Sequence, residues 1–269
     1  MATTKHWTEG RLARIATPLL IGTAALVAWE WLVWQREIPR YVLPAPSLIA
    51  STIWNDWSPL STAWLVTLRT MISALLVAVL GGVLLAIVFS VSRVLEMSLF
   101  PYAIVLQVTP LIAIAPLINV WLGDRVWLVL LVCAWIVAFF PILSNTVIGL
   151  KSADQNLRDL MTLYHASSWQ RLRHLSAPAA LPYFLGGLKI SANLSLVGAI
   201  VAEFAVGAGG AQAGLATTIL ESSFRGEIPR TFAALSLVSL TGIVTYFLIH
   251  GFSQWMLGSW HESALKGEV

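Results

Sequence analysis

The sequence contains few charged side chains for its length. Asp, Glu, Lys and Arg make up 11% of the 269 residues, whereas an average soluble domain has roughly 25%. Hydrophobic residues make up 58%, and this balance is typical of an integral membrane protein. The net charge of +3 is spread over several loops, so it forms no basic patch of the kind that binds nucleic acid. We therefore expect a membrane protein that does not bind nucleic acid.

Cysteine pairs, metal-ligand clusters and catalytic motifs are also missing. The one cysteine, Cys133, lies in an apolar run, so no disulfide framework is possible and we expect a buried, inert thiol. The histidines show none of the spacings with Cys, Asp or Glu that bind zinc. Neither a Gly-Lys-Ser/Thr phosphate-binding loop nor a Gly-x-Ser-x-Gly elbow occurs. The sequence therefore predicts no catalytic residue, no metal site and no cofactor bound by this chain.

Long apolar stretches dominate what remains. A helix needs roughly 20 apolar residues to cross the ~30 Å hydrocarbon layer of a membrane. Six stretches have about this length: residues 15–35, 68–91, 97–122, 126–150, 185–206 and 232–254. A connection with two prolines follows the first stretch and leads into a short amphipathic helix that ends near Asp56, and a glycine-rich loop at 207–214 precedes another short helix at 215–223. We expect an all-α protein with six transmembrane helices.

The distribution of lysine and arginine predicts the orientation. Cytoplasmic segments of membrane proteins carry an excess of these residues. With the N-terminus inside, most of the 16 Lys and Arg residues lie on the cytoplasmic side, together with the terminal segments 1–14 and 255–269. The first apolar stretch is rich in Trp and is not followed by a small-residue cleavage site. We therefore expect it to remain as an anchor rather than to be removed as a signal peptide.

One long polar segment, residues 151–182, lies between the fourth and fifth predicted spans. Ser-x-x-Gln patterns at 152–155 and 167–170 each predict a capping box at the start of a helix. The first helix has apolar residues at the i, i+3, i+4 and i+7 positions of one face: Leu157, Leu160, Met161 and Tyr164. Pro178 and Pro182 are expected to interrupt the segment after the second helix. Two short amphipathic helices between spans indicate a docking element, and a passive helix at the lipid headgroups is the alternative.

This segment resembles the EAA loop in the permease subunits of bacterial ABC importers. That pattern reads Glu-Ala-Ala, three residues, Gly, nine residues and Ile-x-Leu-Pro. The spacing is kept by Asp159-Leu160-Met161, His165 and Leu175-Ser176-Ala177-Pro178, although Asp replaces Glu, Leu and Met replace two Ala, His replaces Gly and Ala replaces Leu. The stretches QVTPLIAIAPLINVWLG and LPYFLGGLKISANLSLVGAIVAEF are similar to the nitrate/sulfonate/taurine branch of this superfamily. The resemblance extends over residues 43–252.

The resemblance implies the architecture and the partners. It implies a permease core of the type I importer (MetI-like) kind with five spans at 67–254, preceded by one added helix and a periplasmic connection in 15–66. It also implies a homodimer in the lipid of the bacterial inner membrane, two ATP-binding subunits that hold ATP and Mg, and a periplasmic solute-binding protein. The implied solute is small and polar, such as a sulfonate, taurine, nitrate or a pyrimidine-like vitamin precursor. The chain itself would then be a transport subunit and not an enzyme.

Spacing and resemblance together place the contact with the ATP-binding subunit on the polar segment. The residues that we expect to form this contact lie on its first helix, on the following turn and at the start of its second helix: Leu157, Arg158, Asp159, Leu160, Met161, Tyr164, His165, Ser167 and Trp169. An amphipathic helix binds a partner by laying its apolar face into a groove. We therefore expect the leucines, Met161 and the aromatic residues to carry the contact, with the charged residues at its edge.

Glu203 is the main candidate for the translocation path. A carboxyl group near the end of a transmembrane helix is costly unless it faces protein or water. We expect Glu203 to line the path or to latch the outer gate between two copies, and a structural hydrogen bond to a neighbouring helix is an equal alternative. Polar residues of the third and fifth predicted spans are further candidates for the path: Gln107, Thr109, Asn119, Ser191 and Asn193. Because such side chains also hold helices together, a packing role is the alternative for them.

The main alternative function is an ion-coupled secondary transporter that works without an ATPase partner. Such transporters usually have inverted repeats and more intramembrane charges, and the sequence shows no repeat. A membrane enzyme would need clustered acids, bases or metal ligands, and a purely structural subunit would not need a capped, amphipathic loop. The importer interpretation explains the polar segment at 151–182, which the alternatives do not.

Overall fold

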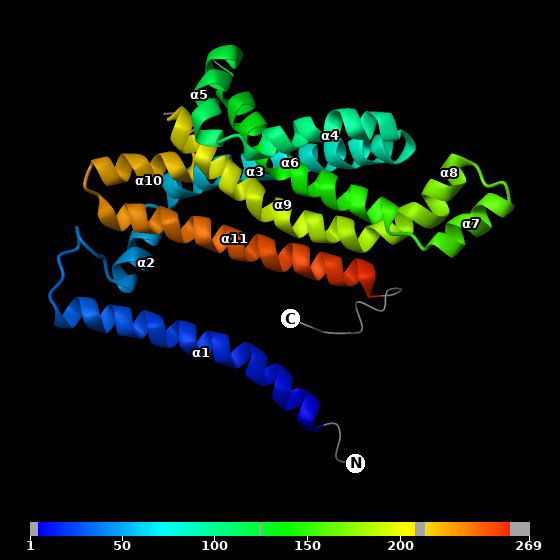
Figure 1. Cartoon of the computed structure of the whole chain (residues 1–269). Helices are drawn as coiled ribbons and strands as arrows, with labels where there is room; N and C mark the ends of the chain where they lie inside the picture. Colours follow the sequence, from blue (N-terminus) through cyan, green and yellow to red (C-terminus); the bar gives the residue numbers. More distant parts are fainter. Residues whose placement is uncertain (1–4, 124, 208–212, 259–269) are drawn as a thin grey trace. The chain divides into compact units, whose positions relative to one another are not determined.

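The structure is a computed structural model that describes residues 5–123, 125–207 and 213–258, with side chains from residue 16 onward. Within these ranges the chain is helical and contains no strand, in agreement with the predicted all-α class. The elements labelled in Figure 1 are, in order, α1 (Lys5–Gln35), α2 (Pro46–Asn55), α3 (Trp57–Val91), α4 (Arg93–Val108), α5 (Leu111–Leu122), α6 (Val126–Lys151), α7 (Gln155–Leu163), α8 (Ser168–Arg171), the π-helical turn η1 (Leu172–Ser176), α9 (Ala177–Val206), α10 (Leu215–Phe224) and α11 (Ile228–Leu257).

The chain folds into two compact units. The first comprises residues 1–60 and 218–236, and the second comprises residues 61–217 and 237–269. In the first unit the carboxyl group of Glu30 on α1 accepts hydrogen bonds from the backbone N–H of Ser47, at 3.0 Å, and from its hydroxyl, at 2.6 Å. This carboxyl group therefore joins α1 to the start of α2, which is consistent with a packing role for Glu30.

Five helical stretches in the described part of the chain are long and apolar enough to cross a membrane. They are Ala16–Gln35, Trp57–Val91, Val126–Lys151, Ser168–Val206 and Ile228–Leu257. The pair formed by α4 and α5 makes a sixth span if it is counted as one, but its two halves are bent by 103°. The six predicted spans thus correspond to five continuous helices and one broken helix.

The break between α4 and α5 corrects the expectation of one continuous helix over 97–122. Thr109 is extended, with φ −69° and ψ 126°, and Pro110 caps the start of α5. The ring of a proline disfavours the helical conformation in the residue before it, and proline has no N–H for the preceding turn. Pro116 and Pro101 are tolerated inside helices, so local context at Thr109 and Pro110 decides where this stretch bends.

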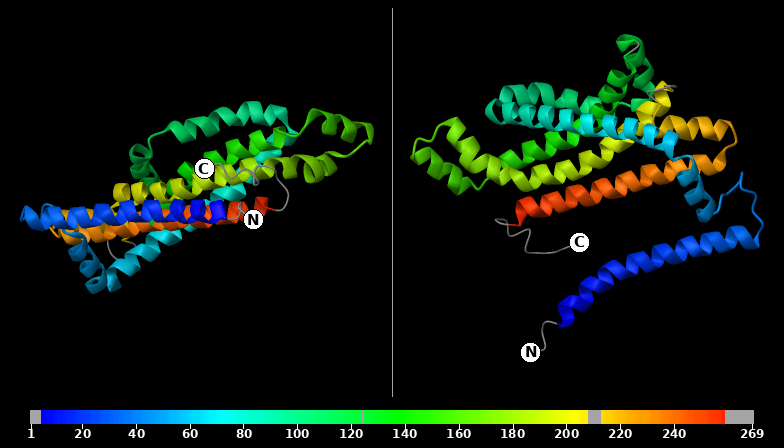
Figure 2. Two further views of the ribbon diagram at one scale, coloured as in Figure 1. Left: turned by 90° about the horizontal axis from the view of Figure 1, so that it is seen from below. Right: turned by 180° about the vertical axis from the view of Figure 1, so that it is seen from behind.

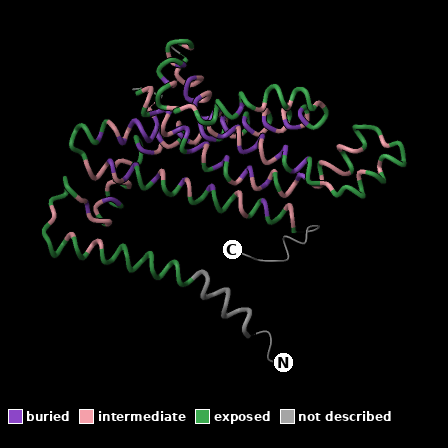
Figure 3. The backbone as a smooth tube through the Cα atoms, in the orientation of Figure 1, coloured by how far each residue is buried: buried purple, intermediate pink, exposed green. Residues whose placement is uncertain are grey.

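The second unit is built around the close packing of α6 against α9. The buried residues gather on these helices in Figure 3, and Figure 2 shows them side by side from two further directions. A Cβ atom added to Gly187 would lie 2.7 Å from the carbonyl oxygen of Pro141, and one added to Gly198 would lie 2.9 Å from the Cα of Ala134. Both distances are shorter than ordinary van der Waals contact, so glycine is required at these positions. Small residues allow transmembrane helices to approach in this way.

The start of the polar segment differs from the prediction. The expected capping box at 152–155 was wrong: Ser152 follows the end of α6, and its hydroxyl donates to the carbonyl of Gly149 at 2.8 Å. The cap of α7 is Asp154, whose side chain accepts from the N–H of Asn156 at 2.7 Å. Asp is as good a cap as Ser, and α6 continues one residue past its predicted end, which leaves Ser152 at the wrong helix terminus.

The end of the polar segment joins the membrane core without interruption. The capping box at 167–170 is confirmed, since the Ser167 side chain accepts from the Gln170 N–H and the Gln170 side chain accepts from the Ser167 N–H. The expected interruption at Pro178 and Pro182 was wrong, because α8, η1 and α9 form one helical stretch. Pro178 lies in the first turn of α9, where a missing N–H costs little.

Candidate functional site

The most prominent candidate site is the exposed apolar face of α7. Leu157 is 49% exposed, Leu160 is 47% exposed, and Leu163 and Tyr164 are 77% and 79% exposed. The residues recur at three- and four-residue spacings, so they lie along one side of the helix. Met161, which the sequence placed on this face, is only partly exposed. Leu163 was missed by the sequence analysis, although its spacing of three from Leu160 was a sufficient signal.

One polar contact joins α7 to the end of α6, and a second lies within α7. The guanidinium group of Arg158 donates to the backbone carbonyl of Lys151, and the side-chain amide of Gln155 donates to the carboxylate of Asp159 at 3.0 Å. Arg158 and Asp159, expected at the edge of the contact, therefore point toward their own loop. In Figures 1 and 2, α7 and α8 extend beyond the adjoining ends of α6 and α9. An apolar helix face is thus presented outside the membrane-spanning core.

The turn between α7 and α8 explains the glycine of the EAA pattern. His165 has φ +52°, which is the left-handed conformation that glycine adopts without strain and other residues adopt rarely. The turn is closed by a bond from the Ala166 N–H to the Met161 carbonyl, at 2.9 Å. After it, Ser167 caps α8 and Trp169 lies exposed on that helix. The structure therefore places Trp169 and the α7 face on the same short loop.

Glu203 lies in a closed hydrogen-bond network at the end of α9. It is fully buried, and one carboxyl oxygen accepts from the Thr67 hydroxyl on α3 at 2.8 Å, while the other accepts from the N–H of Ala216 at 2.9 Å. The Thr67 hydroxyl in turn accepts from the N–H of Leu215 at 2.9 Å. These two amides are among those that a helix N-terminus leaves without an internal partner. Glu203 and Thr67 thus cap α10 from two other helices.

Gly214 completes the Glu203 network. A Cβ atom at this position would collide with both carboxyl oxygens of Glu203. The backbone at the start of α10 can therefore approach the carboxyl group only because residue 214 has no side chain. The sequence analysis assigned Gly214 to a glycine-rich loop at 207–214, of which residues 208–212 lie outside the described residues. The network makes no direct use of the other residues predicted to line a path.

The remaining path candidates differ in burial and in hydrogen bonding. Ser191 is buried, and its hydroxyl donates to the Ala138 carbonyl at 2.7 Å, so it joins α9 to α6. Asn193 is exposed on another side of α9, and Gln107 is exposed at the end of α4. Thr109 lies at the break and donates to the carbonyl of Val105 at 2.7 Å, and Asn119 is partly exposed on α5. Ser191 and Thr109 thus each donate to a backbone carbonyl and not to another of the five candidates.

Two expectations about reactive groups concern the interior of the second unit. Cys133 is a free thiol and is fully buried, as the sequence predicted. Among the described residues, no group of three or more His, Cys, Asp or Glu side chains is placed to hold a metal ion. The candidate sites of this chain are therefore a presented surface and a buried hydrogen-bond network, and neither has the geometry of a reaction centre.

Comparison with known proteins agrees with this picture. Residues 78–258 match the family described as the inner membrane component of binding-protein-dependent transport systems. The chain is 33% identical to the riboflavin transport system permease protein RibX of Chloroflexus aurantiacus, over 88% of the chain and 87% of the relative. It is 31% identical to the formylaminopyrimidine transport permease protein ThiX of Halalkalibacterium halodurans, over 86% and 91%. It is 27% identical to the taurine transport system permease protein TauC of Escherichia coli, over 90% of both.

The matched region starts inside α3 and ends after α11, so it contains the α7–α8 loop, the broken pair α4–α5, Glu203 and the start of α10, whereas Thr67 lies before it. Relatives named as permeases for aliphatic sulfonates and for nitrate match as well, over 84% and 65% of the chain. The chain therefore belongs to the family of inner membrane components of binding-protein-dependent transport systems, the ABC transporter permeases, in their nitrate, sulfonate and taurine branch.

Proposed function

We propose that this chain forms the translocation path of an ATP-driven importer and that its α7 face docks onto a separate ATP-binding subunit. The observation that carries the proposal is the row of exposed apolar residues on α7, a helix that the bond from Arg158 to the Lys151 carbonyl joins to the end of α6. An exposed apolar surface on a helix outside the membrane favours a protein partner. The two loops of a homodimer would engage two ATP-binding subunits, which hold the ATP and Mg.

We call the α7–α8 segment, residues 155–171, the docking loop. Its connection to the membrane core supports a mechanical role for this loop. Because α8, η1 and α9 form one helical stretch, a displacement of the docked loop would be passed to α9 without an intervening flexible link. At the other end of α9, Glu203 holds the start of α10. ATP binding and hydrolysis in the partner would thus move the loop and α9 together, and the path would open alternately to the two sides of the membrane.

For the solute we propose a small polar molecule delivered by a periplasmic binding protein. The two relatives at 31–33% identity are named as riboflavin and formylaminopyrimidine transport permeases, whereas the taurine and sulfonate relatives are 26–27% identical. This order favours a nitrogen heterocycle over a sulfonate. Asn193 on the exposed side of α9, Gln107 and Thr109 at the α4–α5 break and Asn119 on α5 are the side chains that we propose for the path. Glu203 would hold the outer gate in shape, with Ser191 fixing α9 to α6.

The proposed placement is the bacterial inner membrane with both termini and the α7–α8 loop in the cytoplasm. The positive-inside distribution of Lys and Arg supports this orientation. An ion-coupled secondary transporter is the alternative function, and it would need no protein partner at α7. The exposed face of α7 favours the importer.

Purification from the native membrane tests the proposed function. The tagged chain is isolated in a mild detergent, and the proteins that accompany it are identified by mass spectrometry. We expect an ATP-binding subunit in about equal amount with the permease, because one docking loop per chain engages one such subunit. Recovery of a stable, folded chain without any ATP-binding protein would contradict the proposal and favour the secondary transporter.

A further inference from the structure

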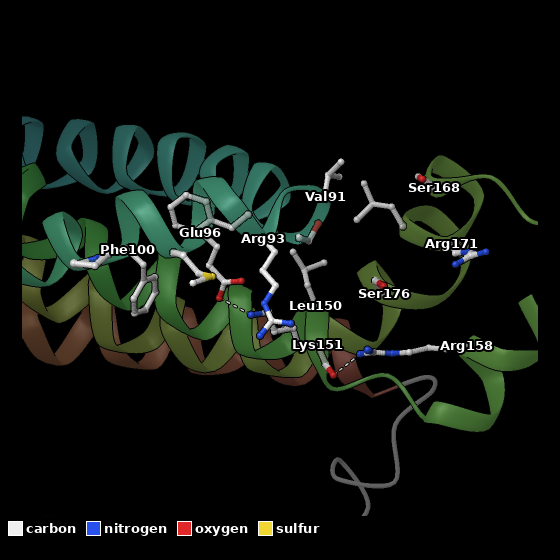
Figure 4. A pocket seen from close by; sticks show the side chains of 15 residues that line it. Val91, Arg93, Glu96, Phe100, Leu150, Lys151, Arg158, Ser168, Arg171 and Ser176 are labelled. Atoms are coloured by element: carbon white, nitrogen blue, oxygen red, sulfur yellow. Dashed lines mark hydrogen bonds and ion pairs between the residues drawn. The ribbon is translucent and has the colours of Figure 1, made fainter. Parts of the chain in front are cut away.

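A pocket of about 860 Å³ lies where the second unit's helices end beside the docking loop. The end of α3, the start of α4, the end of α6 and the helix α8 form its walls. Figure 4 shows Arg93 of α4 and Arg158 of α7 approaching the end of α6 from opposite sides, with Arg171 of α8 nearby. Since α3 and α6 end here and α4 starts here, the pocket would lie near a membrane surface. Of its lining residues, only Arg158 belongs to the contact predicted for the ATP-binding subunit.

The charge of the pocket is strongly unbalanced. Four basic side chains line it, from four different helices: Arg93, Lys151, Arg158 and Arg171. The one carboxylate among the lining residues, Glu96, forms an ion pair with the Nζ of Lys151. Three guanidinium groups therefore remain without a carboxylate partner in the wall of the pocket, which makes it a site for an anion.

Backbone contacts hold two of these guanidinium groups in position. Arg158 donates to the carbonyl of Lys151, and the Nε of Arg171 donates to the carbonyl of Ala166 at 3.1 Å. A carbonyl orients a guanidinium group but does not neutralise its charge. The remaining N–H groups of each fork are the donors that bind phosphate oxygens in pairs. The site is thus arranged for a phosphate group rather than for a diffuse counterion.

The apolar part of the wall favours a lipid over a free anion. Phe89 and Leu150 are buried beneath the pocket, and Met97 and Phe100 line it from α4. A free phosphate ion would gain nothing from these side chains, whereas the first carbons of an acyl chain would bury apolar surface against them. Basic pockets between transmembrane helices on the cytoplasmic side are the sites at which anionic lipids bind.

We propose that this pocket binds the phosphate headgroup of an anionic phospholipid, with part of an acyl chain lying against Met97 and Phe100. The lipid would connect α4 and the end of α6 to the docking loop, because Arg93 belongs to the core and Arg158 and Arg171 belong to α7 and α8. Anionic lipid would then hold the loop in its presented position. This binding depends on the chain's own residues and not on an ATP-binding partner.

Lipid retention measured on the full-length chain tests the proposal. The protein is exchanged into detergent with dioleoylphosphatidylglycerol or dioleoylphosphatidylcholine, and bound lipid is counted by native mass spectrometry. Each basic residue near a membrane surface is worth about a fivefold change in binding. We therefore expect retained phosphatidylglycerol to fall about thirtyfold in the double variant Arg93→Gln with Arg171→Gln, while phosphatidylcholine is not retained by either protein.

Arg173→Gln is the matched control, because Arg173 is an exposed basic residue beside Arg171 that does not line the pocket. We expect it to retain phosphatidylglycerol as the unchanged chain does. An equal loss in the control, equal retention of phosphatidylcholine, or displacement of the lipid by millimolar inorganic phosphate would each overturn the proposal. Should the double variant not fold, Arg93→Gln alone is expected to lose about fivefold, and unchanged binding by it would equally overturn the proposal.

Discussion

Replacing Leu160 by Asp is expected to separate the permease from its ATP-binding subunit. Leu160 lies in the exposed apolar face of α7 between Leu157 and Leu163, where a docked partner would cover it. Truncating a hot-spot residue at the centre of an interface costs ~2 kcal/mol or more, and a buried, unpaired charge adds a further cost. We therefore expect the ATP-binding subunit to be lost from the purified complex and ATP-driven uptake to fall with it.

The control for Leu160→Asp is Thr162→Asp on the same helix. Thr162 is exposed on the other side of α7, and its hydroxyl donates to the Arg158 carbonyl. Both variants add one negative charge to the loop, so a general electrostatic effect would appear in both. The docking account predicts that only Leu160→Asp loses the partner, while both variants unfold at the temperature of the unchanged chain. Equal retention of the ATP-binding subunit by the two variants would refute a contact through this face.

Replacing Glu203 by Ala is expected to destabilise the junction between α9 and α10 and to abolish transport. The Ala216 N–H would lose its acceptor in a buried site, and a cavity would form beside Gly214. A buried amide without a partner costs ~1–3 kcal/mol, and the cavity adds to this. The Thr67 hydroxyl can turn to the Ala63 carbonyl, which lies 3.3 Å away. We therefore expect a total loss of about 3 kcal/mol, measured as a lower unfolding temperature in detergent.

Thr67→Val separates a structural role of Glu203 from a role in the path. The valine keeps the shape of Thr67 but removes the hydroxyl that donates to Glu203 and accepts from the Leu215 N–H. If Glu203 acts by capping α10, Thr67→Val reproduces part of the loss of stability and of transport. If Glu203 instead contacts the solute, Glu203→Ala lowers transport at unchanged stability and Thr67→Val has little effect. Glu221→Gln, in an exposed carboxyl group of the same helix α10, is expected to change neither quantity.

The membrane-spanning helices could be predicted well from the sequence because length and apolarity decide them locally. The stretch at 126–150 was expected within one residue of α6. The amphipathic face of α7 was also predictable, since Leu157, Leu160 and Tyr164 follow the helical period. The capping box at Ser167, which the structure confirms, was predictable because both of its bonds lie within four residues. These three features depend on neighbouring residues and were therefore accessible without tertiary information.

The features that were missed depend on residues far apart in the chain or on competing local choices. The partners of Glu203 include Thr67, which precedes it by 136 positions, so the network could not be found from spacing. The requirement for glycine at 187 and 198 arises from backbone atoms of α6. Ser152 and Asp154 were both possible caps, and the end of α6 decided between them. In each case tertiary contact or helix length selected among choices that the local sequence left open.

Cross-linking from residue 160 is the measurement that tests docking through α7 most directly. The one native cysteine, Cys133, is fully buried, so a cysteine introduced by Leu160→Cys would be the reactive thiol. A photoreactive maleimide attached there is activated in native membranes, and the adducts are identified by mass spectrometry. Docking predicts a covalent adduct with an ATP-binding subunit, with a much lower yield from Thr162→Cys. Adducts with lipid alone, at equal yield from both positions, would contradict it.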